Sequence, residues 1–216
     1  MVATPVKVDI PKPVGEKRVA FHGLSWDDYL QIFNALPQDR HSRLSFSDGT
    51  LEITVPLEDH EFALRLIELF IRLLVLEMGL KMKTMGSTTM NRQDIKKGAE
   101  PDCAYYIQNQ PKVTGRNVDF DRDSPPDLIV EVDITNTDVN KNKLYATMGV
   151  PEFWRYDGAT LRIFTLQNGE YQEREISPLF PIIQKEDLYN FLAEAMEDET
   201  AAMQNFQAFL KEKIKD

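Results

Sequence analysis

Apolar residues recur along the chain with two different periods, and these periods predict alternating strands and helices. Two runs that alternate apolar and polar residues, 43–47 and 51–55, flank Asp48-Gly49. Asp-Gly between two such runs is a strong signal for a two-residue hairpin turn. The sequence therefore predicts a β-hairpin early in the chain.

A long helix is predicted from Asp59 to Met78, with Gly79 as its C-cap. Most of its positions are apolar, and its polar residues form one narrow stripe at helical spacing: Glu61, Arg65, Glu68 and Arg72. A helix of this kind is buried on most sides, as it is when it packs on a sheet. The charges within Phe62–Met78 exclude a membrane span.

The remaining pattern completes a mixed α/β order. Ser25 and Asp28 form a capping box for a helix that ends near Leu36. Asp157-Gly158 and Asn168-Gly169 indicate an antiparallel meander of the last strands. Strands are expected at 81–86, 102–108, 127–135, near 153, and at 161–166 and 171–176; further helices are expected at 138–148, 186–196 and 199–213. Order and lengths predict a central mixed sheet flanked by helices.

Length and composition indicate one domain. A chain of 216 residues supports one sizeable core, and we expect a single domain at 21–216 after a loose lead-in at 1–20. The single cysteine, Cys103, excludes an internal disulfide and fits a reducing, cytoplasmic setting. The net charge of −10 counts against broad nucleic-acid binding, which depends on Lys and Arg.

The strand at 127–135 carries an unusual acidic face. Alternation places Asp127, Glu131 and Asp133 on one side together with Ile129, and the opposite side carries Leu128, Val130, Val132 and Ile134. A bound cation would explain such an alignment of acids. A solvent-exposed sheet face with acidic side chains explains it equally well.

Asp102 strengthens the interpretation as a metal site. It follows Pro101 at the start of a predicted strand, where it is also a plausible turn residue. Mg²⁺ needs only one or two protein carboxylates, because water and phosphate oxygens complete its octahedron. Asp102 and Glu131 on adjacent strands would supply them.

Several motifs together resemble one family. They are Glu100-Pro101-Asp102, the run from Pro126 through Asp127 and Glu131 to Val132, the segment from Asn140 to Ala146, and Gly149 to Trp154. They are similar to the Uma2 family of the PD-(D/E)xK nuclease superfamily, with a match from about Trp26 to Leu192. The resemblance implies a restriction-endonuclease-like core, a Mg²⁺ or Mn²⁺ ion bound by Asp102 and Glu131, and phosphodiester hydrolysis.

The sequence departs from the superfamily pattern at one position. Asp133 stands where that pattern has a lysine, so a lysine must come from elsewhere to offset the charge that develops on the phosphate. The resemblance implies that it lies on the following helix, where Lys141 and Lys143 are candidates. Helical spacing puts Lys141 on the apolar face, near Glu131 and Asp133, and Lys143 on another face.

Other candidates have structural alternatives of similar weight. Glu61 would be an additional acid of the site, or an ordinary partner of Arg65 in the first helical turn. For His60 the structural interpretation is favoured. The basic segment from Lys81 to Lys97 would contact phosphates or form a solvated strand and loop.

These observations predict a metal-dependent DNA endonuclease whose binding to DNA is weak and requires metal. Catalysis would involve Asp102, Glu131, Lys141 and Glu61, and a homodimer would place two sites on a duplex. One alternative is a catalytically silent nucleic-acid-binding or protein-interaction module, which Asp133 and the acidic charge favour. Another is a metal-dependent hydrolase of a different phosphate ester.

Overall fold

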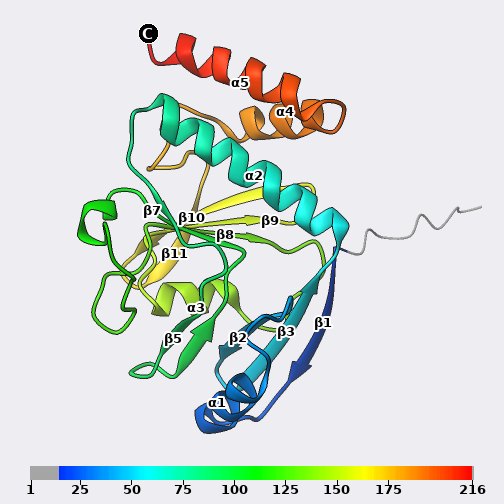
Figure 1. The fold of residues 1–216 in the computed structure, drawn as a ribbon, viewed down its shortest axis with the longest axis vertical. Helices are drawn as coiled ribbons and strands as arrows, with labels where there is room; N and C mark the ends of the chain where they lie inside the picture. Colours follow the sequence, from blue (N-terminus) through cyan, green and yellow to red (C-terminus); the bar gives the residue numbers. More distant parts are fainter. Residues whose placement is uncertain (1–14, 216) are drawn as a thin grey trace, which may run out of the picture.

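The computed structural model describes residues 15–215, which form two β-sheets and their covering helices (Figure 1). The first sheet has five antiparallel strands in the order β1-β3-β2-β6-β5. They are β1 (Glu16–Phe21), β2 (Arg43–Ser47), β3 (Thr50–Pro56), β5 (Met90–Arg92) and β6 (Lys97–Ala99). Helix α1 (Trp26–Ala35) packs on it through Trp26 and Tyr29.

The second sheet has six strands in the order β11-β10-β9-β8-β7-β4. They are β4 (Lys83–Thr84), β7 (Cys103–Tyr106), β8 (Leu128–Val132), β9 (Glu152–Tyr156), β10 (Leu161–Gln167) and β11 (Glu170–Arg174). β8 and β9 are parallel, whereas the other pairs are antiparallel, so the sheet is mixed. A parallel pair needs a crossover, and helix α3 (Lys141–Thr147) lies in it.

The helices cover both faces of this second sheet. Helices α2 (Glu58–Glu77), α4 (Lys185–Ala195) and α5 (Glu199–Lys213) lie together on one face, and α3 lies on the other (Figure 1). Leu128, Val130 and Val132 of β8 are buried with the three helices, and Ile129 is buried with α3. The predicted alternation of this strand is confirmed, and its acidic side is enclosed rather than exposed to solvent.

Most predicted elements are present, with shifted ends. The hairpin, the meander and the helices near 25–36, 59–78, 186–196 and 199–213 are confirmed, and Ser25 forms its capping box. The strand expected at 127–135 ends at Val132. The helix expected at 138–148 begins only at Lys141, because the side chain of Asn140 caps it.

The lead-in expected at 1–20 is too long. Residues 1–14 lie outside the described residues, but Glu16–Phe21 forms β1 and pairs with β3 over its whole length. The sequence analysis also missed β5 and β6, which are three residues long and flank a turn. Within residues 15–215, no helix is long and apolar enough to cross a membrane.

Candidate active site

Asp102 and Glu131 lie opposite each other on neighbouring strands. In the antiparallel register of β7 and β8, Cys103 pairs with Val130, and one step further along brings Asp102 level with Glu131. The amide of Val132 donates to Asp102 Oδ2 at 2.7 Å. Both acids are buried, with 4% and 2% of their surface exposed.

Two basic side chains hold Asp102 in addition to the amide of Val132. Arg43 Nη1 donates to its Oδ1, and His60 Nε2 lies 3.0 Å from its Oδ2. Burial on its own would raise the pKa of Asp102. The hydrogen bond from His60 and the charges of His60, Arg43 and Lys141 outweigh burial and hold that pKa well below its usual value. Asp102 is therefore a carboxylate at neutral pH.

Glu131 has the opposite electrostatic balance. Its Oε1 accepts from the hydroxyl of Tyr145, and its Oε2 accepts from Lys141 Nζ at 2.8 Å. Burial and the nearby carboxylates of Asp102 and Asp133 raise the pKa of Glu131 and together outweigh the charge of Lys141, which lowers it, so that this pKa is about 7. Two acids on adjacent strands thus have pKa values that their surroundings move apart.

Lys141 occupies the place that its position on the helix predicts. It is 5% exposed, and its ammonium donates to Glu131 and, at 2.7 Å, to Asp133. The pKa of Lys141 is lowered by burial but raised more strongly by Asp133 and Glu131, so it stays charged. Lys143 is exposed and pairs with Asp48 at 3.0 Å. The predicted facing of both lysines is confirmed.

Asp133 is neutralised by three cations. Arg18 Nη2 lies 2.6 Å from its Oδ1, Lys141 Nζ also reaches Oδ1, and Arg155 Nε lies 3.0 Å from its Oδ2. Burial would raise its pKa, but these charges lower it. The acid that replaces the superfamily lysine is therefore an anchor for Lys141 rather than an uncompensated charge.

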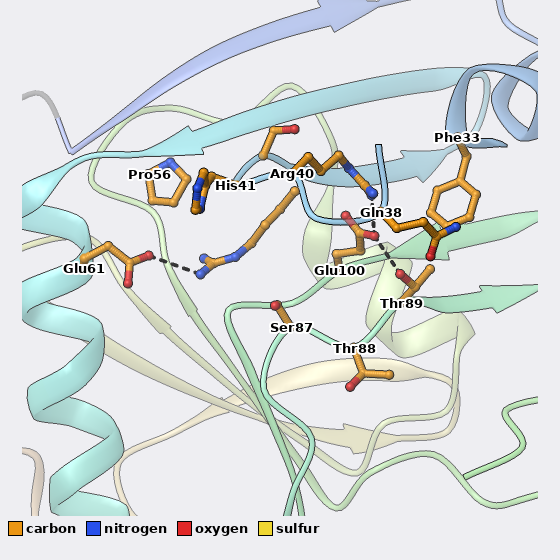
Figure 2. A pocket seen from close by; sticks show the side chains of 12 residues that line it. Phe33, Gln38, Arg40, His41, Pro56, Glu61, Ser87, Thr88, Thr89 and Glu100 are labelled. Carbon is orange, nitrogen blue, oxygen red and sulfur yellow. Dashed lines mark hydrogen bonds and ion pairs between the residues drawn. The ribbon is translucent and has the colours of Figure 1, made fainter. Parts of the chain in front are cut away.

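Glu61 lies at the rim of the site. Its side chain, labelled in Figure 2, is 41% exposed. It accepts from Arg43 at 3.2 Å and from Arg65 at 3.4 Å. The expected pair with Arg65 is present. Arg43 bridges Glu61 to Asp102, and His60 Nδ1 lies 3.7 Å from Glu61 Oε1, so Glu61 reaches Asp102 through these two side chains.

Sequence reasoning missed several residues of this cluster. Arg43 and Arg18 come from strands of the first sheet, and nothing in the sequence brings them near Asp102 or Asp133. The sequence favours a structural role for His60, whose ring is buried against Asp102; within residues 15–215 its Nδ1 has no hydrogen-bond partner. Tyr145 was placed on the correct helix face, but its hydroxyl was not assigned a partner.

The basic segment 81–97 does not join this cluster. Lys83 donates to the carbonyl of Val113 at 3.2 Å, Lys97 donates to Ser47 at 2.7 Å, and Arg92 pairs with Asp94 at 2.7 Å. These side chains stabilise local loops and strands. The arrangement favours the structural alternative for this segment.

The carboxylates of Asp102 and Glu131 are ligands of the kind that a small hard cation takes, but the space between them is small and their oxygens already have hydrogen-bond donors. A cavity of about 10 Å³, room for about one water molecule, is lined by Asp102, Glu131 and Lys141 among others. Two carboxylates suffice for Mg²⁺ when water and substrate oxygens complete its shell. Among residues 15–215, no cluster of three or more His, Cys, Asp or Glu has metal-binding geometry. All four oxygens of the two acids accept hydrogen bonds from protein groups, so a cation would have to share or replace these donors.

Comparison with known proteins agrees with this geometry. The model of the Uma2 family, described as "Putative restriction endonuclease", matches residues 26–195. A crystal structure described as a "putative nuclease belonging to DUF820" from Anabaena variabilis superposes with a TM-score of 0.53. It is 18% identical and covers 78% of this chain and 99% of its own. No curated protein sequence matches this chain.

The family match runs from α1 to α4 and includes Asp102, Glu131, Asp133 and Lys141, whereas β1, which carries Arg18, precedes it. The similarity to the solved structure supports the predicted fold class, a mixed sheet with flanking helices of the restriction-endonuclease type. This chain belongs to the Uma2 family.

Proposed function

We propose that this protein is an endonuclease that hydrolyses DNA phosphodiester bonds with the help of Mg²⁺ or Mn²⁺. One observation carries the proposal: Asp102 and Glu131 converge from adjacent strands on a single small cavity that Lys141 also lines. Paired carboxylates with a lysine nearby are the parts that phosphodiester hydrolysis with a metal ion needs. The family match supports the same reaction class.

The candidate roles follow from the contacts. Asp102 and Glu131 would hold the cation, which when bound would neutralise phosphate charge and lower the pKa of a water molecule. Lys141 would stabilise the charge that develops on the phosphate, since its partners keep it protonated. His60 and Tyr145 would be positioning residues, each fixing the orientation of one carboxylate.

A second candidate function is a silent module that binds nucleic acid or protein on the same fold. It is favoured by the completeness of the ion pairs, because Arg43 and Lys141 already occupy the two acids. In this alternative the cluster would only join the two sheets. The two functions differ in whether a divalent ion changes the protein.

The decisive experiment measures metal binding and cleavage together. Thermal unfolding with added Mn²⁺ should show stabilisation by mass action in the wild type and its loss in Asp102→Asn and Glu131→Gln. Glu58→Gln, which removes an exposed acid from the first turn of α2, is the control and should keep the response. Plasmid, linear duplex and single-stranded DNA are then incubated with each variant and metal.

Each outcome selects among the candidates. Metal-dependent cutting that disappears in both site variants supports the proposal. If Mn²⁺ does not stabilise the wild type and the wild type cuts no DNA, the endonuclease proposal is excluded and the silent binding module remains. Hydrolysis of a nitrophenyl phosphodiester without any cleavage of DNA would indicate a hydrolase of another phosphate ester.

A further inference from the structure

A polar cleft of about 650 Å³ adjoins the cavity between Asp102 and Glu131 (Figure 2). Arg43 and Glu100 line both spaces, so the cleft leads towards the acidic pair. Phe33, Gln38 and Arg40 lie on one wall, and Ser87 and Thr88 lie on the other. The cleft therefore connects solvent with the candidate catalytic groups.

The size of this cleft limits what it holds. Proteins bind single small ligands in cavities of roughly 300–1,000 Å³, a range that accommodates one or two nucleotides but not a paired stretch of duplex. Asp102 and Glu131 are themselves almost completely buried. A phosphodiester bond must therefore enter the protein to reach them, and an unpaired strand enters a narrow cleft more readily than a double helix.

The charges of the cleft do not favour phosphate tracking. Arg40 pairs with Glu100 at 2.5 Å, and Arg43 pairs with Glu61 at 3.2 Å. The positive charges of the two arginines are balanced by the two acids, so these pairs leave no excess of positive charge in the cleft. The whole chain has a net charge of −10. Binding in this cleft must come from contacts with a base or sugar rather than from an excess of positive charge.

The walls offer such contacts. The guanidinium of Arg40 lies 5.3 Å from the ring centroid of Phe33, which forms a flat surface of the kind on which nucleobases stack. Glu100 fixes this surface and also accepts from the hydroxyl of Thr89 at 2.6 Å. The exposed side chains of Gln38 and Ser87 provide hydrogen-bonding groups for base edges.

We propose that this cleft binds an unpaired nucleotide of the DNA strand to be cut, so that the preferred substrate is single-stranded or locally unpaired DNA. This inference rests on the proposed nuclease function and specifies its substrate. The base stacks against Phe33 and Arg40, and the adjoining phosphate lies towards Arg43 and the acidic pair.

The test measures the affinity of the full chain for a labelled single-stranded oligonucleotide and for its duplex, with Ca²⁺ present as a cation that takes oxygen ligands. The wild type should bind the single strand at least about tenfold more tightly. Phe33→Ala should weaken that binding about 5- to 100-fold, the usual effect of losing one stacked base. Ser87→Trp, which fills the cleft from an exposed position, should weaken it as well.

The chain offers a matched control. Phe209 on α5 is also a half-buried phenylalanine, and Lys213 Nζ lies 5.4 Å from its ring centroid. Phe209→Ala should leave the affinity for the single strand unchanged. Thermal unfolding of each variant identifies any that fail to fold, and Ser87→Trp still tests the cleft if Phe33→Ala is one of them.

The results that overturn this inference differ from those that overturn the nuclease function. Duplex bound or cut as well as the single strand, or folded Phe33→Ala and Ser87→Trp proteins with unchanged affinity, would exclude the cleft as a nucleotide site and leave the nuclease proposal intact. Failure of the wild type to bind either form of DNA would reject both.

Discussion

At the scale of single residues, Asp102 and Glu131 are two similar acids whose surroundings treat them differently. Asp102 has arginine and histidine donors that favour its ionised form. Glu131 is buried beside two other carboxylates and shares the cation that pairs with it, Lys141, with Asp133. Two acids with different pKa values can have different roles in one site. Asp102 is ionised at all physiological pH values, whereas the ionisation of Glu131 depends on the charge that is bound beside it.

This difference predicts that the two acids contribute differently to the pH dependence of stability. The pKa of Glu131 is raised in the folded state from 4.5 to about 7, so the folded protein binds more protons than the unfolded one between these values. The free energy of unfolding should therefore fall as the pH rises through that window. Relative to the wild type, Glu131→Gln should gain stability between pH 5 and pH 8 in metal-free buffer.

Asp102→Asn is the counterpart in the same unfolding experiment. The lowered pKa of Asp102 stabilises the fold at every pH above its unfolded value of about 3.9. The direct contribution of Asp102 is thus constant from pH 5 to pH 8. The deficit of the Asn variant should still narrow as the pH rises, because Glu131 loses a neighbouring charge that raises its pKa. Parallel curves for wild type and Glu131→Gln would contradict the raised pKa of Glu131.

Lys141 allows a second test at this scale. Lys141→Met should reduce turnover per folded molecule by about 10²–10³-fold, as expected for one lost transition-state donor. Because Glu131 and Asp133 lose a buried partner, it should also cost about 3–5 kcal/mol of stability. Turnover is therefore normalised to the folded fraction. Lys143→Met, whose lysine is exposed, is the control and should change neither quantity.

At the scale of elements, the long periodic segments could be predicted from the sequence and the short ones could not. Helix α2 and the β2–β3 hairpin are each specified by a strong local pattern, because the residues that form each signal lie close together in the sequence. β6 has only three residues, and its position depends on pairing with β2, about fifty residues earlier. Asp102, Glu131 and Lys141 were predicted because they lie on strongly patterned segments, whereas Arg18 and Arg43 reach the site only through tertiary structure.

Gly98 shows how tightly β6 packs against α1. A Cβ atom at this position would lie 2.5 Å from the hydroxyl of Tyr29 and 2.5 Å from Asn91 Oδ1. Tyr29 is completely buried and donates to that same Asn91 oxygen at 2.7 Å, so it has no room to move. Gly98→Ala should destabilise the protein by about 1–3 kcal/mol.

Chemical denaturation measures this change. Gly98→Ala combined with Tyr29→Phe, which removes the nearest hydroxyl, should lose less stability than the sum of the two single variants. An unchanged unfolding midpoint for Gly98→Ala would mean that α1 shifts freely on the sheet.

At the scale of the whole molecule, charge limits how the protein would bind DNA, the substrate proposed above. With a net charge of −10, Lys and Arg would neutralise few phosphates. Binding to duplex DNA should be weak and should need a divalent ion, and its logarithm should fall with the logarithm of salt concentration on a shallow slope. Titrations at several salt concentrations measure this slope. Tight binding in EDTA with a steep slope would reveal a large basic surface.

The contact between Arg18 and Asp133 also has a consequence for the order of folding. The two residues are 115 positions apart, whereas β1 pairs with β3 in the nearby chain. The first hairpin can therefore form early and locally, but Asp133 meets Arg18 only when the two sheets come together. Long-range contacts of this kind form slowly. We predict that this contact forms after the rate-limiting step, so that Arg18→Ala accelerates unfolding more than it slows folding. Measured folding and unfolding rates of the variant would test this order.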